Sequence, residues 1–293
     1  MLRGLYSATA GMIAQQRKHD AATNNISNLN TPGFKATNTV TRSFPEMLIG
    51  IIRDGQNGPK GSIGSLHGGV FAEESLPSFL QGDVTATDNP TDLAIVSNIQ
   101  IEGLEFDDSG KAVTPQGEIV YQPQAFFTVA GTDGEVRYTR NGKFSVNETG
   151  EWVTSTGFRL LGQDGQPVRL VGQPGDIQIG PNGILIDTVT GEAAVDENGE
   201  PMRLLISVVD NPYDLVREGD GNFRLTEGSQ PARQLVADEP VQVLQGYVER
   251  SNVDPTAATV DMMSALRAYE ANQRVVQFYD RSMEKAVNEV GRV

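Results

Sequence analysis

The chain of 293 residues contains no cysteine and only two histidines, His19 and His67. Without cysteine there is no disulfide bond and no thiolate metal site. Neither histidine has a serine or a second metal-ligating residue at a useful spacing, which argues against nucleophilic catalysis and zinc binding. We therefore expect no catalytic residue, no metal site and no cofactor.

Aromatic residues make up 6% of the chain and hydrophobic residues 38%, whereas there are 32 glycines and 15 prolines. This composition indicates a β-rich, turn-rich protein with modest cores rather than a large α/β enzyme. No apolar run approaches the length of a membrane span, so we expect no membrane insertion.

Positive charge is scarce, and the formal net charge is −15. The charge is −18 over residues 61–240, +4 over residues 1–60 and −1 over residues 241–293. Nucleic-acid binding needs a basic footprint, so an acidic middle segment argues against a nucleic-acid partner. It is typical of a solvated surface that keeps a protein soluble.

The stretch from Leu5 to Lys35 predicts one long helix with an abrupt end. Apolar or small residues recur at steps of three and four, which predicts a narrow, coiled-coil-like seam; they are Leu5, Ala8, Met12, Ala22, Ile26 and Leu29. Pro32 and Gly33 suit the second and third positions of a type II turn, where Gly33 supplies the positive φ. A helix with so thin a seam needs a partner.

The C-terminal segment predicts that partner. Asp254 and Pro255 have the pattern of an N-cap and a first helical residue. Steps of four and three then run through Met262, Leu266, Tyr269, Gln273, Val276, Asp280, Met283, Val287 and Val290. We expect paired terminal helices, although the same pattern fits two helices that pack on an ordinary core.

Between the helices the chain predicts an antiparallel, hairpin-built β body. Short β-rich runs alternate with Asn-Gly and Asp-Gly turns; the runs are 93–96, 99–106, 118–121, 125–129, 136–139, 144–146, 152–155, 159–161, 177–179, 184–187, 202–209, 222–225 and 241–245. The expected layout is a terminal helical polymerisation domain (1–35 and 255–293), an extended crossing segment with a glycine-rich linker (36–82), a β body (83–245) and a return connection (246–254). A short helix is expected at 43–49, and the glycine-dense stretch 55–69 is expected to be a connector.

Three separate runs resemble the signatures of bacterial flagellar rod and hook proteins. The first is Asn24-Asn25-Ile26-Ser27-Asn28-Leu29-Asn30-Thr31-Pro32-Gly33-Phe34-Lys35. The C-terminal signature is similar to residues 246–249, 251–253 and 267–272, and a third similarity covers residues 91–95, 126–129, 138–144 and 150–157. Residues 97–124 stand where most relatives continue directly between two strands, so an extra hairpin is expected there.

The resemblance, closest to basal-body rod proteins, implies a structural, non-enzymatic subunit whose terminal helices form the inner tube of a helical assembly. Its expected partners are further copies of itself, other rod and hook subunits and the flagellar export apparatus, and it is expected to be exported by the type III route without a cleaved signal peptide. The implied N-terminal seam is Leu5, Met12, Asn24, Asn25, Ile26, Asn28, Leu29, Pro32, Gly33 and Phe34. The implied C-terminal seam is Met262, Leu266, Arg267, Tyr269, Glu270, Asn272, Gln273, Val276 and Met283.

Two alternatives come from other classes of protein. A secreted β-rich hydrolase would use a pair of carboxylates, and a surface adhesin would carry its β domain on a helical stalk. The asparagine cluster at 24–30 also has two interpretations: its amides are either solvated at a frayed helix end or hydrogen-bonded across subunits.

Overall fold

The computed structural model describes residues 2–50, 62–101, 103–107, 110–131, 133–169, 174–180, 183–188, 190–195, 201–236 and 239–290. The chain divides into two compact units. The first comprises Met1–Ser27, Thr37–Leu76 and Asp254–Val293, and the second comprises Asn28–Ala36 and Pro77–Val253.

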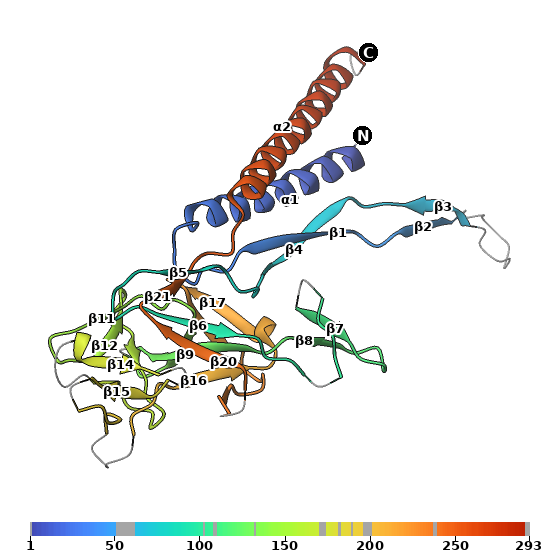
Figure 1. The fold of residues 1–293 in the computed structure, drawn as a ribbon. Coiled ribbons are helices and arrows are strands. Elements are labelled where there is room, and N and C mark those ends of the chain that lie inside the picture. Colours follow the sequence, from blue (N-terminus) through green and yellow to red (C-terminus); the bar gives the residue numbers. More distant parts are fainter. Residues whose placement is uncertain are drawn as a thin grey trace. The chain divides into compact units, whose positions relative to one another are not determined.

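The first unit contains the two terminal helices, α1 (Leu2–Ser27) and α2 (Pro255–Lys285), and a π-helical turn, Ala286–Val290, follows α2. The predicted cap is confirmed, because the Asp254 carboxylate accepts hydrogen bonds from the amides of Thr256 and Ala257. Figure 1 shows the two helices side by side, with the start of α1 and the end of α2 at the same end of the pair. No helix among the described residues has the length and apolarity needed to cross a membrane.

The predicted extension of the first helix to the 31–34 turn is wrong, because α1 ends at Ser27. A separate turn follows, in which the Thr31 amide donates to the Asn28 carbonyl over 3.2 Å. Pro32 disfavours helical geometry at the residue before it, and asparagine side chains compete for backbone hydrogen bonds. Together these effects end the helix several residues early.

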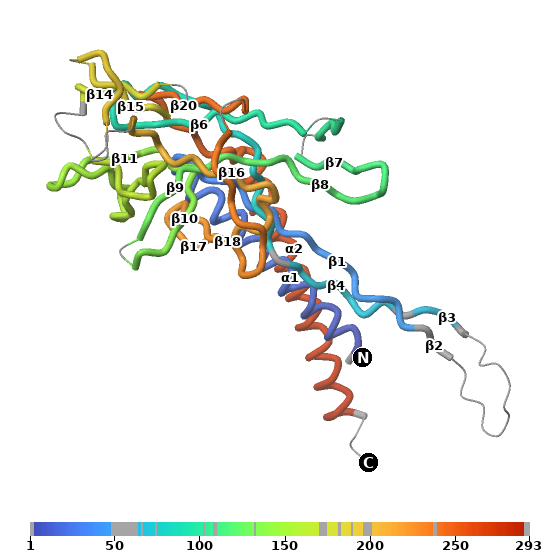
Figure 2. Tube along the Cα trace, turned by 90° about the horizontal axis from the view of Figure 1, so that it is seen from below, coloured from blue at the N-terminus to red at the C-terminus, as the bar shows by residue number. Residues whose placement is uncertain are grey.

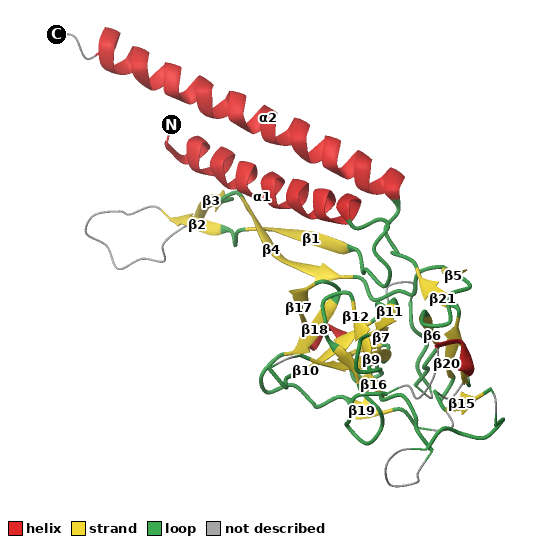
Figure 3. Ribbon diagram, turned by 90° about the vertical axis from the view of Figure 1, so that its left-hand side faces the viewer, coloured by secondary structure: helices red, strands yellow, loops and turns green. Residues whose placement is uncertain are grey.

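A two-stranded ribbon completes the first unit (Figure 3). β1 (Thr37–Ser43) pairs with β4 (Val70–Pro77), and β2 (Met47–Gly50) pairs antiparallel with β3 (Ser62–Leu66). The short helix expected at 43–49 is therefore wrong: cross-strand pairing overrides the weak helix signal of this segment. Part of the expected glycine connector is strand β3, and its residues 55–61 lie outside the described residues.

The second unit is built from antiparallel strands. Its largest sheet has nine strands: β9 (Gln124–Ala130), β10 (Val136–Thr139), β11 (Phe144–Val146), β12 (Trp152–Thr154), β13 (Arg159–Leu160), β16 (Ile206–Val209), β17 (Leu215–Gly219), β18 (Asn222–Leu225) and β19 (Arg233–Gln234). Among the described residues of this unit, four two-stranded sheets accompany it: β5 (Val84–Ala86) with β21 (Tyr247–Glu249), β6 (Leu93–Ser97) with β20 (Val241–Gln245), β7 (Lys111–Val113) with β8 (Ile119–Tyr121), and β14 (Ile177–Ile179) with β15 (Leu185–Asp187).

The predicted fold class is confirmed as a mainly antiparallel β protein with a helix at each end. Within residues 97–124 the expected hairpin is present as β7 and β8, which Figure 2 shows running side by side. A strand over 99–106 is wrong, because the described residues of that run form no strand. Ile99 is nevertheless buried, so its apolar character serves packing from a loop.

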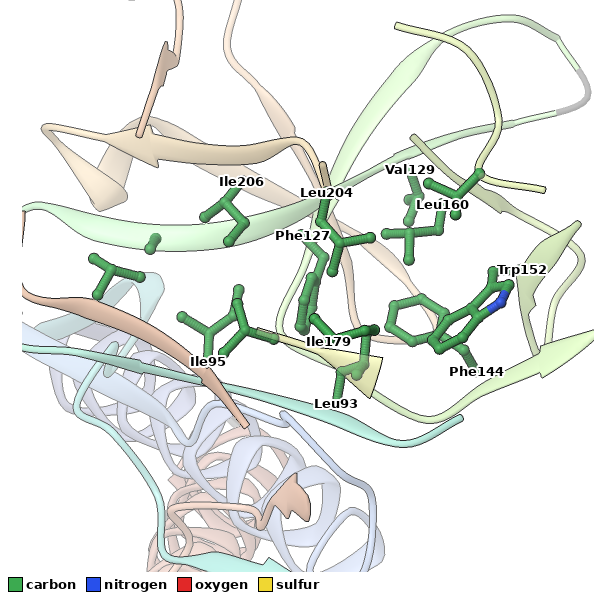
Figure 4. Packing of buried hydrophobic residues seen from close by; sticks show 14 of the residues in the cluster. Leu93, Ile95, Phe127, Val129, Phe144, Trp152, Leu160, Ile179, Leu204 and Ile206 are labelled. Atoms are coloured by element: carbon green, nitrogen blue, oxygen red, sulfur yellow. The ribbon is translucent and has the colours of Figure 1, made fainter. Parts of the chain in front are cut away.

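One hydrophobic cluster lies between the sheets of the second unit. Figure 4 shows Leu93 and Ile95 of β6 facing side chains of the large sheet, among them Phe127 and Ile206. Phe127 packs edge-on against Phe144, with 5.4 Å between ring centroids. Aromatic pairs of this geometry contribute about 0.5–1.5 kcal/mol beyond their buried area.

Candidate functional site

The contact between α1 and α2 follows one stripe on each helix, which we call the contact stripe. On α1 it contains the buried or half-buried residues Gly4, Ala8, Gly11, Gln15, Lys18, Ala22 and Asn25. On α2 it contains Ala258, Met262, Ala265, Tyr269, Asn272, Val276, Tyr279 and Met283. Both sets advance by four and three residues, so each forms a narrow face.

Glycine allows close approach along this stripe. A Cβ atom at Gly4 would lie 2.1 Å from the Tyr279 hydroxyl oxygen, and one at Gly11 would lie 3.1 Å from the Asn272 amide nitrogen. Because position 4 meets 279 and position 11 meets 272, the helices run antiparallel.

The predicted C-terminal seam and the contact stripe share only part of their residues. Met262, Tyr269, Asn272, Val276 and Met283 lie half-buried on the stripe, whereas the exposed members are Leu266, Arg267, Glu270 and Gln273. The stripe passes through the small Ala265 instead of the larger Leu266. On α1, Leu5, Met12 and Ile26 are half-buried beside the stripe, and Asn24 is exposed.

Large apolar side chains remain exposed elsewhere on α2. Phe278 is 68% exposed, Val260 60% and Met263 48%. Large apolar side chains that stay exposed in a single chain are often found where another protein binds.

Asn25 is buried, and its amide is satisfied inside the chain. The Asn25 Nδ2 donates to the Thr37 carbonyl and its Oδ1 accepts from the Thr37 amide, both over 2.9 Å. These two bonds fix the start of β1 against the end of α1. Hydrogen bonding of the asparagine cluster across subunits stays a prediction.

The remaining N-terminal seam residues, from Asn28 to Phe34, belong to the second unit. The predicted turn is confirmed there: the Phe34 amide donates to the Thr31 carbonyl, and Gly33 has φ +68°. A Cβ atom at Gly33 would lie 2.3 Å from the carbonyl carbon of Arg140. Glycine is thus required twice at this position, for its backbone angle and for the close approach.

Phe34 is buried in the second unit beneath an arginine. The Arg217 guanidinium lies 4.4 Å from the Phe34 ring centroid, and its Nη2 donates to the Lys35 carbonyl over 2.6 Å. Burial lowers the pKa of Arg217. Stacking of this kind contributes about 0.5–2 kcal/mol, more where the charge is desolvated.

The next residue, Lys35, enters a cluster of three buried charges, Lys35, Glu249 and Arg140, which we call the ionic cluster; each side chain is 1% exposed. The Lys35 ammonium donates to Glu249 Oε1 over 2.7 Å and to the Leu80 carbonyl over 2.8 Å. Glu249 Oε1 also accepts from the Gly82 amide over 2.8 Å, and Oε2 accepts from Arg140 over 3.2 Å. The carboxylate is therefore shared between two cations and a backbone amide.

Arg140 ties the ionic cluster to the core strands. Its Nη1 donates to the Ile95 carbonyl of β6 over 3.1 Å, and its Nη2 donates to Ser97 and to Gln124 of β9, both over 2.8 Å. The guanidinium carbon lies 5.5 Å from the Phe126 ring centroid. Two neighbouring sheets thus meet at one guanidinium.

The ionic cluster holds two cations and one anion, and the pKa values of Lys35 and Glu249 are both lowered. Burial is the main cause that lowers the pKa of the Lys35 ammonium from 10.5 to about 8. The charge of Glu249 opposes this shift, and the smaller effect of the Arg140 charge adds to it. For Glu249, burial opposes ionisation, but the charges of Arg140 and Lys35 outweigh it and hold the pKa of the carboxyl below its ordinary value. Glu249 is therefore ionised at neutral pH.

Asn252 joins the segments that surround the cluster. Its Oδ1 accepts from the Ala36 amide over 2.6 Å, and its Nδ2 donates to the carbonyls of Ser78 and Leu80, each over 2.9 Å. The backbone amide of Asn252 also donates to the Phe34 carbonyl. We call residues 28–36, 77–82 and 250–253 the junction segments, because the chain passes between the two units at their ends.

Lys35, Arg140, Glu249 and Asn252 all lie within the runs that resemble the family signatures. The sequence pattern did not predict them as site residues. Lys35 and Glu249 are 214 positions apart, and no spacing rule brings them together. The first signature carries one charged residue, Lys35, but the other two carry several, so the sequence alone does not indicate which charges pair. Among the described residues, no group of His, Asp or Glu is arranged to hold a metal ion.

A hairpin-built β body flanked by helices with exposed apolar side chains fits a structural protein that assembles through its ends. Three family profiles match the chain: flagella basal body rod protein over residues 5–35, flagellar hook protein FlgE/F/G D1 domain over 121–200, and flagellar basal body rod FlgEFG protein C-terminal over 244–289.

Whole-chain relatives agree with these profiles. The flagellar hook-basal body complex protein FlhO of Bacillus subtilis is 35% identical over 299 residues and covers 100% of both chains. The flagellar basal-body rod protein FlgG of Borreliella burgdorferi is 30% identical and covers 98% of each chain. FlgG of Caulobacter vibrioides is 29% identical and covers 97% of each. The chain belongs to the flagellar basal-body rod and hook protein family and is a structural subunit of the flagellum.

Proposed function

We propose that the chain polymerises through its terminal segments, 1–35 and 255–293, into the axial tube of the basal-body rod, where the assembled subunits transmit torque. In this arrangement the terminal helices pack in a coiled-coil-like manner with those of neighbouring copies. Head-to-tail contacts that do not close into a ring generate a helical assembly. The crossing segment 36–82, the β body 83–245 and the return connection 246–254 surround or join that tube.

The exposed apolar side chains of α2 carry this proposal. Phe278, Val260 and Met263 lie away from the contact stripe and are 48–68% exposed. Apolar side chains on both sides of a helix are explained when one side packs on α1 and the other on a neighbour. Leu266, Arg267, Glu270 and Gln273, which are exposed in the single chain, extend the surface available to that neighbour.

The partners that follow are further copies of the chain, other rod and hook subunits, and the flagellar export apparatus. Export by the type III route without signal-peptide cleavage is part of the same proposal. We further propose that the subunit is not an enzyme and needs no cofactor, since its buried charges are engaged with one another rather than open to a substrate.

Substitutions at Phe278 test the proposal in cells. Because the side chain is exposed, Phe278→Asp should change the free energy of unfolding of the free subunit by no more than about 0.5 kcal/mol. Burying the new carboxylate between subunits would cost several kcal/mol, so rods should fail to form and swimming should be lost. Phe278→Leu keeps the position apolar and is the matched control. Normal swimming of the Phe278→Asp strain would contradict the proposal.

A further inference from the structure

The three junction segments, 28–36, 77–82 and 250–253, are fastened to one another rather than independently attached. Asn252 bonds to Ala36, Ser78 and Leu80, so one amide side chain connects all three segments. The Gly33 amide donates to the Glu249 carbonyl over 2.8 Å, and the Arg250 amide donates to the Asp83 carbonyl over 2.8 Å. A pull on any one segment is therefore shared by the other two.

The ionic cluster supplies the strongest of these connections. Glu249 receives Lys35 from the first junction segment and the Gly82 amide from the second. Hydrogen bonds with an ionised partner are about twice as strong as neutral ones. At 1% exposure, water cannot replace either partner when the bonds are strained.

The cluster also connects the segments to the interior of the β body. Arg140 bonds to Glu249 on one side and to Ile95, Ser97 and Gln124 on the other. A force that enters at Lys35 thus reaches strands β6 and β9 through two side chains. If the cluster only held the junction segments in place, Arg140 would not need hydrogen bonds to residues of both sheets.

We propose that Lys35, Glu249 and Arg140 form a mechanical lock that passes load between the junction segments and the β body. The proposal rests on the proposed function, because it assumes that the rod carries torque. It adds that these three residues, rather than the surface ion pairs, decide how much load one subunit withstands. Surface pairs such as Arg137 with Glu218, 14% and 29% exposed, are weakened by solvent.

The test compares Glu249→Gln with Glu218→Gln, the same change at a surface ion pair. Each variant replaces the wild-type chain in two strains, one with rotating flagellar motors and one whose motors cannot rotate. Hook–basal bodies that contain the subunit are counted by electron microscopy, and detached filaments are counted in the medium. The lock predicts equal numbers of intact rods for both variants without rotation, and at least a several-fold increase of broken or shed structures for Glu249→Gln under rotation in viscous medium.

Two outcomes overturn the lock. Intact Glu249→Gln rods under rotation would show that the cluster carries no load, and rods missing equally with and without rotation would show that the residue serves folding alone. Lys35→Met, which leaves Glu249 with Arg140 and Gly82, is the second variant if Glu249→Gln does not fold, and the same shedding is expected. If the proposed rod function itself is wrong, the wild-type chain will be absent from hook–basal bodies. This result is distinct from either outcome that overturns the lock.

Discussion

At the scale of single residues, Gly33 shows how one position satisfies two constraints. Its φ of +68° is unfavourable for residues with a Cβ atom, and its α-carbon faces the backbone at Arg140 and Asn141. The turn pattern predicted the backbone angle. The close approach was not predictable, since nothing local to residues 31–34 indicates which distant backbone lies against them.

Gly33→Ala should therefore destabilise the subunit more than the same substitution at a glycine where only the backbone angle is unusual. We expect a loss of about 2–4 kcal/mol, of which strain at positive φ accounts for roughly 1–2 kcal/mol and displacement of the backbone for the rest. Gly157, with φ +85° and nothing within 4 Å, is the matched control, and Gly157→Ala should show only the strain. Urea unfolding of both purified variants gives the comparison, and equal losses would refute the close approach.

The lowered pKa of Lys35 makes the free energy of unfolding depend on pH in a defined direction. Its pKa is about 8 in the folded chain against 10.5 when exposed, so between these values the unfolded chain binds one more proton and stability from this group rises with pH. The rise is at most about 3 kcal/mol. Other titrating groups are common to wild type and Lys35→Met, so the difference between their unfolding free energies should grow in favour of the wild type from pH 8 to pH 10.5. A constant difference would contradict the buried, charge-rich environment.

At the scale of elements, the sequence predicted what local chemistry decides and missed what distant contacts decide. Strands 136–139, 144–146 and 222–225 begin and end where alternation and turn residues placed them. β21, expected as a connection, is short and forms by pairing with β5. The contact stripe on α2 runs through Ala265 instead of the predicted Leu266, because close helix packing selects small or fitting side chains and not the most apolar ones.

The N-cap of α2 is an element whose contribution can be measured. Asp254→Ala removes the acceptor for two amides of the first helical turn and should cost about 1 kcal/mol. Asp254→Asn retains a good cap and should cost much less. Thermal unfolding followed by helical circular dichroism distinguishes the two variants, and an equal shift would mean that charge rather than capping is responsible.

At the scale of the whole molecule, the two compact units make the β body a separable part. A fragment of residues 77–253 keeps Glu249 with Arg140 and Gly82, whereas a fragment of residues 83–245 loses Glu249 and strand β21 and leaves Arg140 buried without its carboxylate. Breaking such a buried pair costs about 3–5 kcal/mol. The longer fragment should thus be more stable by about 3 kcal/mol or more in urea. Equal stabilities would show that the ionic cluster contributes little.

The central claim is that exposed side chains of α2 contact other subunits in the assembled rod. The most direct measurement replaces Phe278 by a photo-crosslinking phenylalanine analogue, irradiates purified hook–basal bodies and separates the products by size. We expect covalent adducts with a second copy of the chain or with another axial subunit, and no such adduct from the free subunit. Hook–basal bodies that contain the chain but yield only uncrosslinked subunit would contradict it.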